Sequence, residues 1–273
     1  MIKQSCFAVE PWSLRETDLD LGCLAQSESV FALSNGHVGW RANLDEGEPH
    51  GLPGSYLNGF YEQRPLPYAE AIYGLPESSQ TVLNVTNGKL IRLFVDDEPF
   101  DVRYGELRSH ERVLDFRDGV LRRNVEWIAP TGRGVRVTST RMVSFTQRAV
   151  AAISYEVTPL DSEVRVAIQS ELLTNEELPQ ASGDPRVAAA LEHPLENEYF
   201  SNNGTAAVLV HKTKRSGLRV GAAMDHMIDG PPGVLVESHT IPDTGIVTAT
   251  TPLKPGERLR IVKFVAYGWS GQR

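Results

Sequence analysis

Apolar and polar residues alternate along most of the chain after residue 80, and turn-forming residues interrupt the alternation roughly every ten positions. Within residues 149–157, for example, Ala149, Ala151, Ile153 and Tyr155 occupy every second position. Side chains two residues apart lie on the same face of a strand, so this spacing predicts strands with one face in a core. Such strands are expected at residues 81–95, 107–116, 120–128, 133–145, 149–157, 164–169, 206–211, 218–223, 234–238, 245–250 and 259–267.

Glycine-containing turn signals divide these runs. Asn87-Gly88 falls inside the first run, and Arg117-Asp118-Gly119 separates the second from the third. Because glycine adopts positive φ without strain, both signals predict tight hairpins. Ser216-Gly217 closes a short basic run and predicts a solvated hairpin tip.

Two segments depart from the strand pattern. Residues 1–27 are interpreted as a leading strand or arm that ends in a turn. Residues 171–201 are rich in Asn, Glu and Pro, with a brief helical pattern only at 185–191. Because the alternating pattern typical of strands resumes at residue 206, we expect 171–201 to be a long connection inside a single domain that spans residues 1–273.

The succession of short strands with almost no helical period predicts the fold class. It is typical of an all-β protein, and the number of strands exceeds that of an immunoglobulin domain. We therefore expect a large antiparallel β-sandwich.

Composition and charge narrow the functional classes. The formal net charge of −8 disfavours a nucleic-acid or anionic-membrane surface, which would require clusters of Lys and Arg. The N-terminus lacks the apolar core of a signal peptide, and no apolar run reaches the ~18 residues of a membrane span. We expect a cytoplasmic protein without nucleic-acid or membrane partners.

The cysteine pattern predicts neither a metal nor a cofactor site. Cys6 and Cys23 are the two cysteines, and neither has a second Cys at the spacing of a zinc or redox motif. Two free thiols are the expected state, with one disulfide as the alternative.

Residues 28–63 hold the densest group of polar turns, glycines and aromatic residues. Glycines at positions such as 36 and 54 allow a close approach of the backbone. Asn35, Gly36 and Gly39 are expected to build a turn that fixes strand pairing, while aromatic faces suit a sugar ring or a core. A glycosidase needs two carboxyl groups beside one bond, and Glu28, Glu62 and Glu70 are the acids near this stretch.

The stretch resembles the start of glycoside hydrolase family 65, which contains maltose, trehalose and kojibiose phosphorylases and related hydrolases. The family opens with E-S-L-F-x-L-x-N-G-x-L-G-x-R and continues with P-G-T-Y-x-x-G-x-Y. The matching residues are Glu28, Ser29, Phe31, Leu33, Asn35, Gly36, Gly39, Arg41, Pro53, Gly54, Tyr56, Gly59 and Tyr61. This chain departs from the pattern at His37, Trp40 and Ser55, and at residues 83–88, where the proline and tryptophan of V-N-L-P-N-W are missing.

Later segments extend the resemblance over nearly the whole chain. Residues 105–122, with His110 and Arg112, residues 141–158, and the closing Lys263-Phe264-Val265-Ala266-Tyr267 are similar to family elements. The resemblance implies a specific form of sandwich, the β-supersandwich similar to galactose mutarotase.

The resemblance also implies a function. The family's catalytic glutamate and its phosphate or water site lie in an (α/α)6 barrel that follows this domain, and the chain stops where a linker to that barrel would begin. We expect an isolated domain, inactive alone. Its parent would cleave an α-linked glucose disaccharide by hydrolysis or with inorganic phosphate as co-substrate. The domain would support its own catalytic barrel, contribute loops to the sugar pocket and help form a homodimer.

The candidate substrate-binding residues follow from this expectation: they are Tyr56, Asn58, Phe60, Tyr61, Arg41 and Glu62. Arg41 has an alternative role as the partner of a buried acid such as Glu28. Two other functions stay open. One is a stand-alone carbohydrate-binding module. The other is a mutarotase-like epimerase, for which His193, His211, His226 and His239 are the candidate acids and bases.

Overall fold

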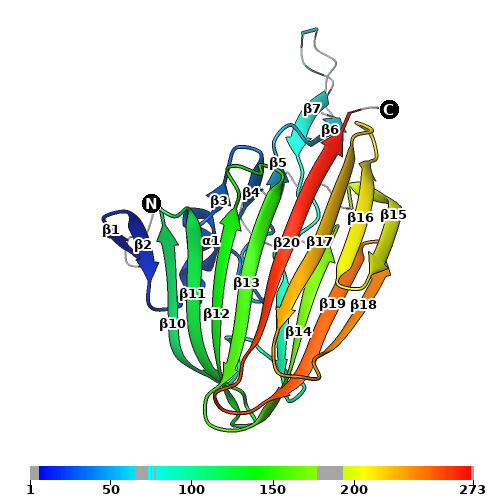
Figure 1. The fold of residues 1–273 in the computed structure, drawn as a ribbon. Helices are drawn as coiled ribbons and strands as arrows, with labels where there is room; N and C mark the ends of the chain where they lie inside the picture. Colours follow the sequence, from blue (N-terminus) through cyan, green and yellow to red (C-terminus); the bar gives the residue numbers. More distant parts are fainter. Residues whose placement is uncertain (1–5, 66–72, 75, 77, 177–192, 272–273) are drawn as a thin grey trace.

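The computed structural model describes residues 6–65, 73, 74, 76, 78–176 and 193–271. Two large antiparallel sheets face each other. An N-terminal segment with one short helix lies at one edge of the larger sheet (Figure 1). The expected all-β, galactose mutarotase-like supersandwich is confirmed. In the described residues the one α-helix is α1 (Leu24–Val30), which follows the 3-10 turn η2 (Leu21–Cys23).

The larger sheet has ten strands in the order β1-β2-β10-β11-β12-β13-β20-β17-β16-β15. Its strands are β1 (Ala8–Glu10), β2 (Ser13–Glu16), β10 (Glu106–Asp115), β11 (Val120–Ile128), β12 (Gly134–Val143), β13 (Val150–Pro159), β20 (Leu259–Ser270), β17 (Arg219–Asp229), β16 (Ala206–Thr213) and β15 (Leu195–Asn203). The central strands coincide closely with the runs expected from the period-two pattern.

The second sheet has five strands in the order β18-β19-β14-β8-β9. They are β18 (Leu235–Ile241), β19 (Thr244–Leu253), β14 (Val164–Leu173), β8 (Ile91–Val95) and β9 (Glu98–Pro99). Two smaller sheets complete the fold: β3 (Leu33–Ser34), β4 (Val38–Trp40) and β5 (Ser55–Leu57) form one, and β6 (Tyr61–Pro65) and β7 (Ser78–Val82) form the other.

The core lies between the two large sheets. Trp127 and Ile153 of the larger sheet and Val166 and Ile168 of the smaller one are completely buried in one hydrophobic cluster. Replacing a buried aromatic or aliphatic side chain of this kind by alanine typically costs about 2 to 5 kcal/mol. Every second side chain along the central strands of both sheets is therefore buried between the sheets, and this accounts for the sandwich.

Two expected turns have different outcomes. The hairpin at Arg117-Asp118-Gly119 is confirmed: Asp115 pairs with Val120, and Gly119 has a φ of 66°. The hairpin at Asn87-Gly88 is wrong, because β7 pairs with β6 and β8 pairs with β14.

A glycine is needed at position 88 because side chains of β20 pack closely against its backbone, and not because the chain turns there. A Cβ atom there would lie 2.7 Å from a methyl group of Val265, and its N–H donates to the Tyr267 hydroxyl. Asn87 instead forms a bridge to Leu173 through two backbone hydrogen bonds. The dipeptide thus ties the chain to β14, a contact distant in sequence that a local turn signal does not reveal.

The expected connection at 171–201 is also too long. Residues 171–173 belong to β14 and residues 195–201 to β15. The brief helix expected at 185–191 lies outside the described residues, as does Glu70. The tip at Ser216-Gly217 is confirmed as the turn between β16 and β17, with a Gly217 φ of 70°. It is not fully solvated as expected, because Ser216 is buried against Glu62.

The expectation of two free thiols is contradicted. Cys6 and Cys23 form a disulfide, with their Cα atoms 6.5 Å apart. The arm formed by β1 and β2 turns back on itself, which brings Cys6 against the start of α1.

Candidate functional site

The Tyr56–Asn58 surface, which consists of β5 and the turn that follows it, is the part of the candidate stretch that meets solvent. Asn58 is exposed, and Tyr56 is half-buried because it points away from its buried neighbours Ser55 and Leu57. The Asn58 N–H donates to the carbonyl of His37 at 2.9 Å, which fixes the turn on β4. In Figure 1, β5 and β6 lie at the same end of the molecule as the end of β20.

Arg41 and Glu28 form a buried ion pair that supports this surface from the interior of the protein. Arg41 Nη2 donates to Glu28 Oε2 at 3.1 Å, and both side chains are buried. The other Glu28 oxygen accepts the Gly51 N–H at 2.9 Å. Arg41 therefore takes its alternative role as the partner of the buried Glu28, and Glu28 connects the pair on α1 to the loop that enters β5.

Gly54 is fitted against this pair. A Cβ at Gly54 would lie 2.1 Å from Arg41 Cδ, and the Gly54 carbonyl accepts the Arg41 backbone N–H at 2.8 Å. Glycine is thus required at this position so that the backbone can pass over the arginine stem.

Lys89 holds the same turn from the core. Its Nζ donates to the Gly54 carbonyl at 3.1 Å and to Ser55 Oγ at 2.7 Å. Burial lowers the pKa of Lys89 to about 7, although the nearby carboxyls of Glu176 and Glu28 favour the charged form. The turn before Tyr56 is thus fixed by hydrogen bonds in the core.

Three other candidate residues have mainly internal contacts. Phe60 is buried against Trp269, with ring centroids 6.4 Å apart. Glu62 is buried, and its carboxylate accepts the backbone N–H groups of Arg215 and Ser216 at 2.9 and 2.7 Å. The half-buried Tyr61 packs against the core. Among the six candidates, Asn58 is exposed and Tyr56 and Tyr61 are half-buried, so these three are the ones open to a ligand.

The stretch between Arg41 and Gly54 also carries a buried ionic network that sequence reasoning missed. Arg123 Nη1 donates to Asp45 and Glu46, and Arg141 Nε donates to Asp45 at 2.8 Å. The Tyr155 hydroxyl donates to Glu46 at 2.8 Å. These bonds fasten the loop after β4 to the inner face of the ten-stranded sheet.

The pKa values in the network reflect burial and pairing. Burial alone would raise the pKa of Asp45, but Arg141 and Arg123 outweigh it and hold the pKa below its ordinary value. Burial and the Glu46 carboxylate raise the pKa of Tyr155 well above its ordinary value. The network is therefore ionised at Asp45 and neutral at Tyr155. A signal did exist in the sequence: Arg123 and Arg141 occupy positions of the neighbouring strands β11 and β12 that the apolar–polar alternation places on the buried face.

The histidines expected of a mutarotase do not form a site. His226 is buried between Thr205 O and Ser170 Oγ, and burial lowers its pKa to about 4. His211 is buried beside Asp243, whose carboxylate lies 2.8 Å from Nε2. His193 and His239 are exposed and lie on different segments of the chain.

Among the residues that the structure describes, one group of His, Cys, Asp or Glu side chains is close enough to hold an ion: Cys6, Asp20 and Cys23. No helix in the same residues has the length and apolar character needed to cross a bilayer.

The architecture places the chain in a class of large β-supersandwich domains. A solved structure of a putative kojibiose phosphorylase from the human microbiome matches 98% of this chain with a TM-score of 0.85 at 19% sequence identity. The match covers 34% of that longer chain, and at this identity it establishes the fold.

Sequence comparison identifies the family. The model of glycosyl hydrolase family 65, N-terminal domain, matches residues 14–272, and the chain belongs to this family. It is 56% identical over its full length to an uncharacterized glycosyl hydrolase of Mycobacterium tuberculosis, and 31% identical over 271 residues to the alpha,alpha-trehalose phosphorylase of Thermoanaerobacter brockii. In both cases the match spans 35% of the relative's length.

Proposed function

We propose that this chain is the N-terminal β-sandwich domain of an enzyme that cleaves an α-linked glucose disaccharide such as maltose, trehalose or kojibiose. The cleavage is phosphorolysis with inorganic phosphate, or hydrolysis. The domain supports an (α/α)6 barrel that carries the catalytic carboxyl, and the protein is cytoplasmic and dimeric. Membership of the family and the trehalose, kojibiose and maltose phosphorylases among its relatives support this proposal.

The Tyr56–Asn58 surface is the observation that supports a sugar-binding site in this domain. Tyr56 offers an aromatic face and Asn58 an amide, and sugar recognition uses these two groups for C–H faces and hydroxyls. Both residues are on a turn fixed by Gly54, Arg41 and Lys89, so they need little ordering when a ligand binds. In this proposal they close one side of the sugar pocket, with Tyr61 beside them.

The first experiment asks whether the parent is longer. An antibody raised against this chain is used to probe a lysate of the source cells. A band far above 30.1 kDa is expected. A band at 30.1 kDa would overturn the assignment to a two-domain enzyme.

The second experiment tests the site in that longer enzyme. Cleavage of the three disaccharides is measured with and without phosphate for the wild type and for Tyr56→Ala and Asn58→Ala. Loss of a stacking or hydrogen-bonding contact worth about 1.4 kcal/mol lowers kcat/KM about tenfold. Tyr199→Ala, at an exposed tyrosine of β15, is the matched control. Unchanged kcat/KM in both site variants would remove the site while leaving the family activity in place.

A groove on the outer face of the larger sheet favours a second candidate, a carbohydrate-binding module. The groove has a volume of about 400 Å³ and is lined by hydrogen-bonding side chains that include Arg15, Glu111, Asn124 and Thr138. Calorimetric titration of the isolated chain with maltose and trehalose tests it. Binding that Asn124→Ala abolishes and Tyr56→Ala leaves intact would favour the module, and no measurable heat would exclude it for these sugars.

A further inference from the structure

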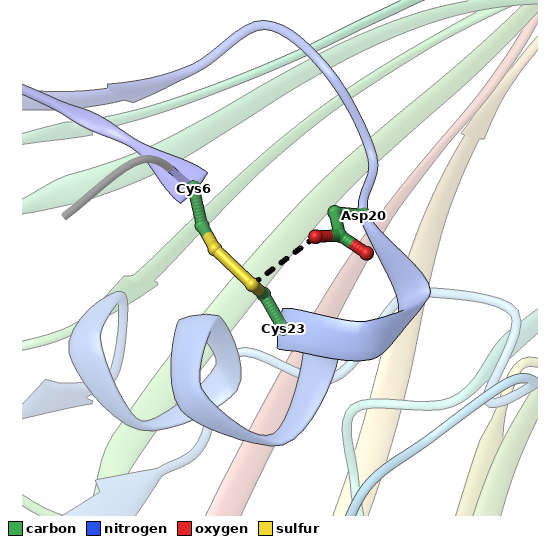
Figure 2. Close-up of side chains that lie close together, drawn as sticks. All are labelled: Cys6, Asp20 and Cys23. Carbon is green, nitrogen blue, oxygen red and sulfur yellow. Dashed lines mark hydrogen bonds between the residues drawn. A yellow bond between two sulfur atoms is a disulfide. The ribbon is translucent and has the colours of Figure 1, made fainter. Parts of the chain in front are cut away.

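Cys6, Asp20 and Cys23 converge where the N-terminal arm meets α1 (Figure 2). One ligand atom from each side chain lies within 4.8 Å of the other two. Both cysteines are buried, whereas Asp20 is exposed, so the group is open to solvent on one side.

The position of Asp20 suits a reduced pair better than a disulfide. Asp20 Oδ2 lies 3.2 Å from Cys23 Sγ, while Oδ1 accepts the Gly22 N–H at 2.8 Å. A disulfide sulfur has no hydrogen to donate, so in the oxidised state this contact holds a carboxylate against a sulfur that cannot form a hydrogen bond with it. A thiol can donate to the carboxylate, and a cation can bridge the two groups.

The donor set identifies the cation. Two thiolates and a carboxylate are ligands of zinc, with Zn–S bonds of about 2.3 Å and Zn–O bonds of about 2.1 Å. A tetrahedral ion with these bonds separates a sulfur and an oxygen by about 3.6 Å, close to the present separation of Asp20 Oδ2 and Cys23 Sγ. Hard cations such as Mg²⁺ and Ca²⁺ favour oxygen and would not use the sulfurs.

We propose that Cys6, Cys23 and Asp20 form a zinc site when the disulfide is reduced, with water as the fourth ligand on the exposed side. A reductant such as a phosphine opens the S–S bond to two thiols, and water supplies the two hydrogens and the oxygen of the phosphine oxide. Zinc then binds both sulfurs with release of two protons. The site is independent of the sugar-cleaving activity proposed for the parent enzyme.

The location gives the site a structural consequence. Cys6 leads into β1 and β2, and β2 pairs with β10 of the larger sheet. Cys23 immediately precedes α1, which carries Glu28, the partner of Arg41. Zinc in the reduced protein thus replaces the disulfide as the link between the arm and the helix that supports the Tyr56–Asn58 surface.

The test is a titration of the phosphine-reduced chain with Co²⁺, a spectroscopic substitute for zinc. We expect one equivalent to bind, with a thiolate-to-cobalt charge-transfer band in the near ultraviolet, and zinc to displace it. Asp20→Asn should weaken Co²⁺ binding at least tenfold, while Asp18→Asn, at an exposed neighbouring carboxylate, should leave it unchanged. The oxidised chain should bind no Co²⁺ at this site.

Cysteine variants complete the test. Cys6→Ser and Cys23→Ser should each abolish the charge-transfer band or reduce it by half or more, and circular dichroism checks their fold. If either variant fails to fold, Asp20→Asn decides the question, because its side chain is exposed and leaves both cysteines in place. Absence of the band in the reduced wild type, or equal Co²⁺ affinity in Asp20→Asn, would overturn the proposal and leave a disulfide alone.

Discussion

The guanidinium of Arg41 and the carboxylate of Glu28 form a buried ion pair, 3.1 Å between Nη2 and Oε2, directly beneath the turn that presents Tyr56. Removing one partner of such a pair leaves the other charge buried without compensation, which costs about 3 to 5 kcal/mol. Glu28→Gln is therefore expected to lower the free energy of unfolding by about this amount, measured by urea denaturation of the chain.

Glu126→Gln is the matched control for this prediction. It makes the same chemical change in the solvent-exposed pair of Glu126 with Arg136. An exposed pair contributes about 0 to 1 kcal/mol, so the control should lose little stability. Equal losses in both variants would show that the buried pair does not support the turn.

Gly54→Ala should destabilise the same region by overpacking. The added Cβ would meet Arg41 Cδ at 2.1 Å, and the buried arginine stem has little room to move. Overpacking of this kind typically costs about 1 to 3 kcal/mol. Urea denaturation measures the loss.

Gly268→Ala tests whether that loss comes from the contact. Gly268 lies on β20, and a Cβ added there would meet no atom within 4 Å. Its stability should change little or rise slightly. A loss as large as that of Gly54→Ala would indicate a general effect of removing glycine and would contradict the packing argument.

The sequence predicted the central strands because period two and one buried face are local properties. Val125 and Ile153 lie inward where the alternation places them. The same local logic failed at Gly88, whose closest contacts are with Val265 and Tyr267 at the other end of the chain. A glycine required for such a contact cannot be distinguished from a turn glycine without knowing what packs against it.

The candidate site was predictable to a similar degree. The resemblance located the stretch, and the pairing of Arg41 with Glu28 was one of two roles considered for that arginine. Which of the candidate residues face solvent became clear only from their burial in the structure. Phe60 and Glu62 have the residue types of a sugar site, yet the structure uses them for a contact with Trp269 and for capping the turn at Ser216. Long-range packing decides which aromatic or carboxylate side chain faces solvent, and that information is absent from a local motif.

Lys89 predicts how stability depends on alkaline pH. Burial lowers its pKa to about 7 in the folded protein from the ordinary value of 10.5. The unfolded chain therefore binds more protons between these values, so stability rises with pH across this window. Each such lysine contributes a slope of at most about 1.4 kcal/mol per pH unit.

Lys89→Met should reduce this slope by about half. Lys263 contributes most of the remainder, because burial also lowers its pKa to about 7. Tyr155 and Tyr267 oppose this slope as the pH approaches 10, because their pKa values are raised in the folded protein. Lys254→Met, at an exposed lysine, should leave the slope unchanged. Urea denaturation between about pH 7 and 10 measures the slopes, and an unaltered slope in Lys89→Met would mean that this amine keeps its proton in the folded state.

His110 makes the stability of the protein depend on acidic pH for the same physical reason. Its side chain is buried on β10, and neither ring nitrogen has a hydrogen-bond partner among the described residues. Burial lowers its pKa to about 3 from 6.5, and the positive charges of Arg123 and Arg112 act in the same direction. The unfolded chain gains a proton on this ring as pH falls below 6.5 whereas the folded chain does not, so stability falls with pH from about 6.5 towards 3.

His110→Phe keeps an aromatic ring on β10 and removes the titrating group. The variant should lose less stability than the wild type when the pH is lowered from about 6.5 to 4, with a reduction in slope of up to about 1.4 kcal/mol per pH unit. Because His239 is exposed, His239→Phe should retain the wild-type slope. His226, with a pKa lowered to about 4 by burial, keeps part of the acid sensitivity in every variant. Parallel pH profiles for His110→Phe and the wild type would mean that the ring accepts a proton in the folded state, with the Glu16 carboxylate, 3.8 Å away, as the group that stabilises the charge.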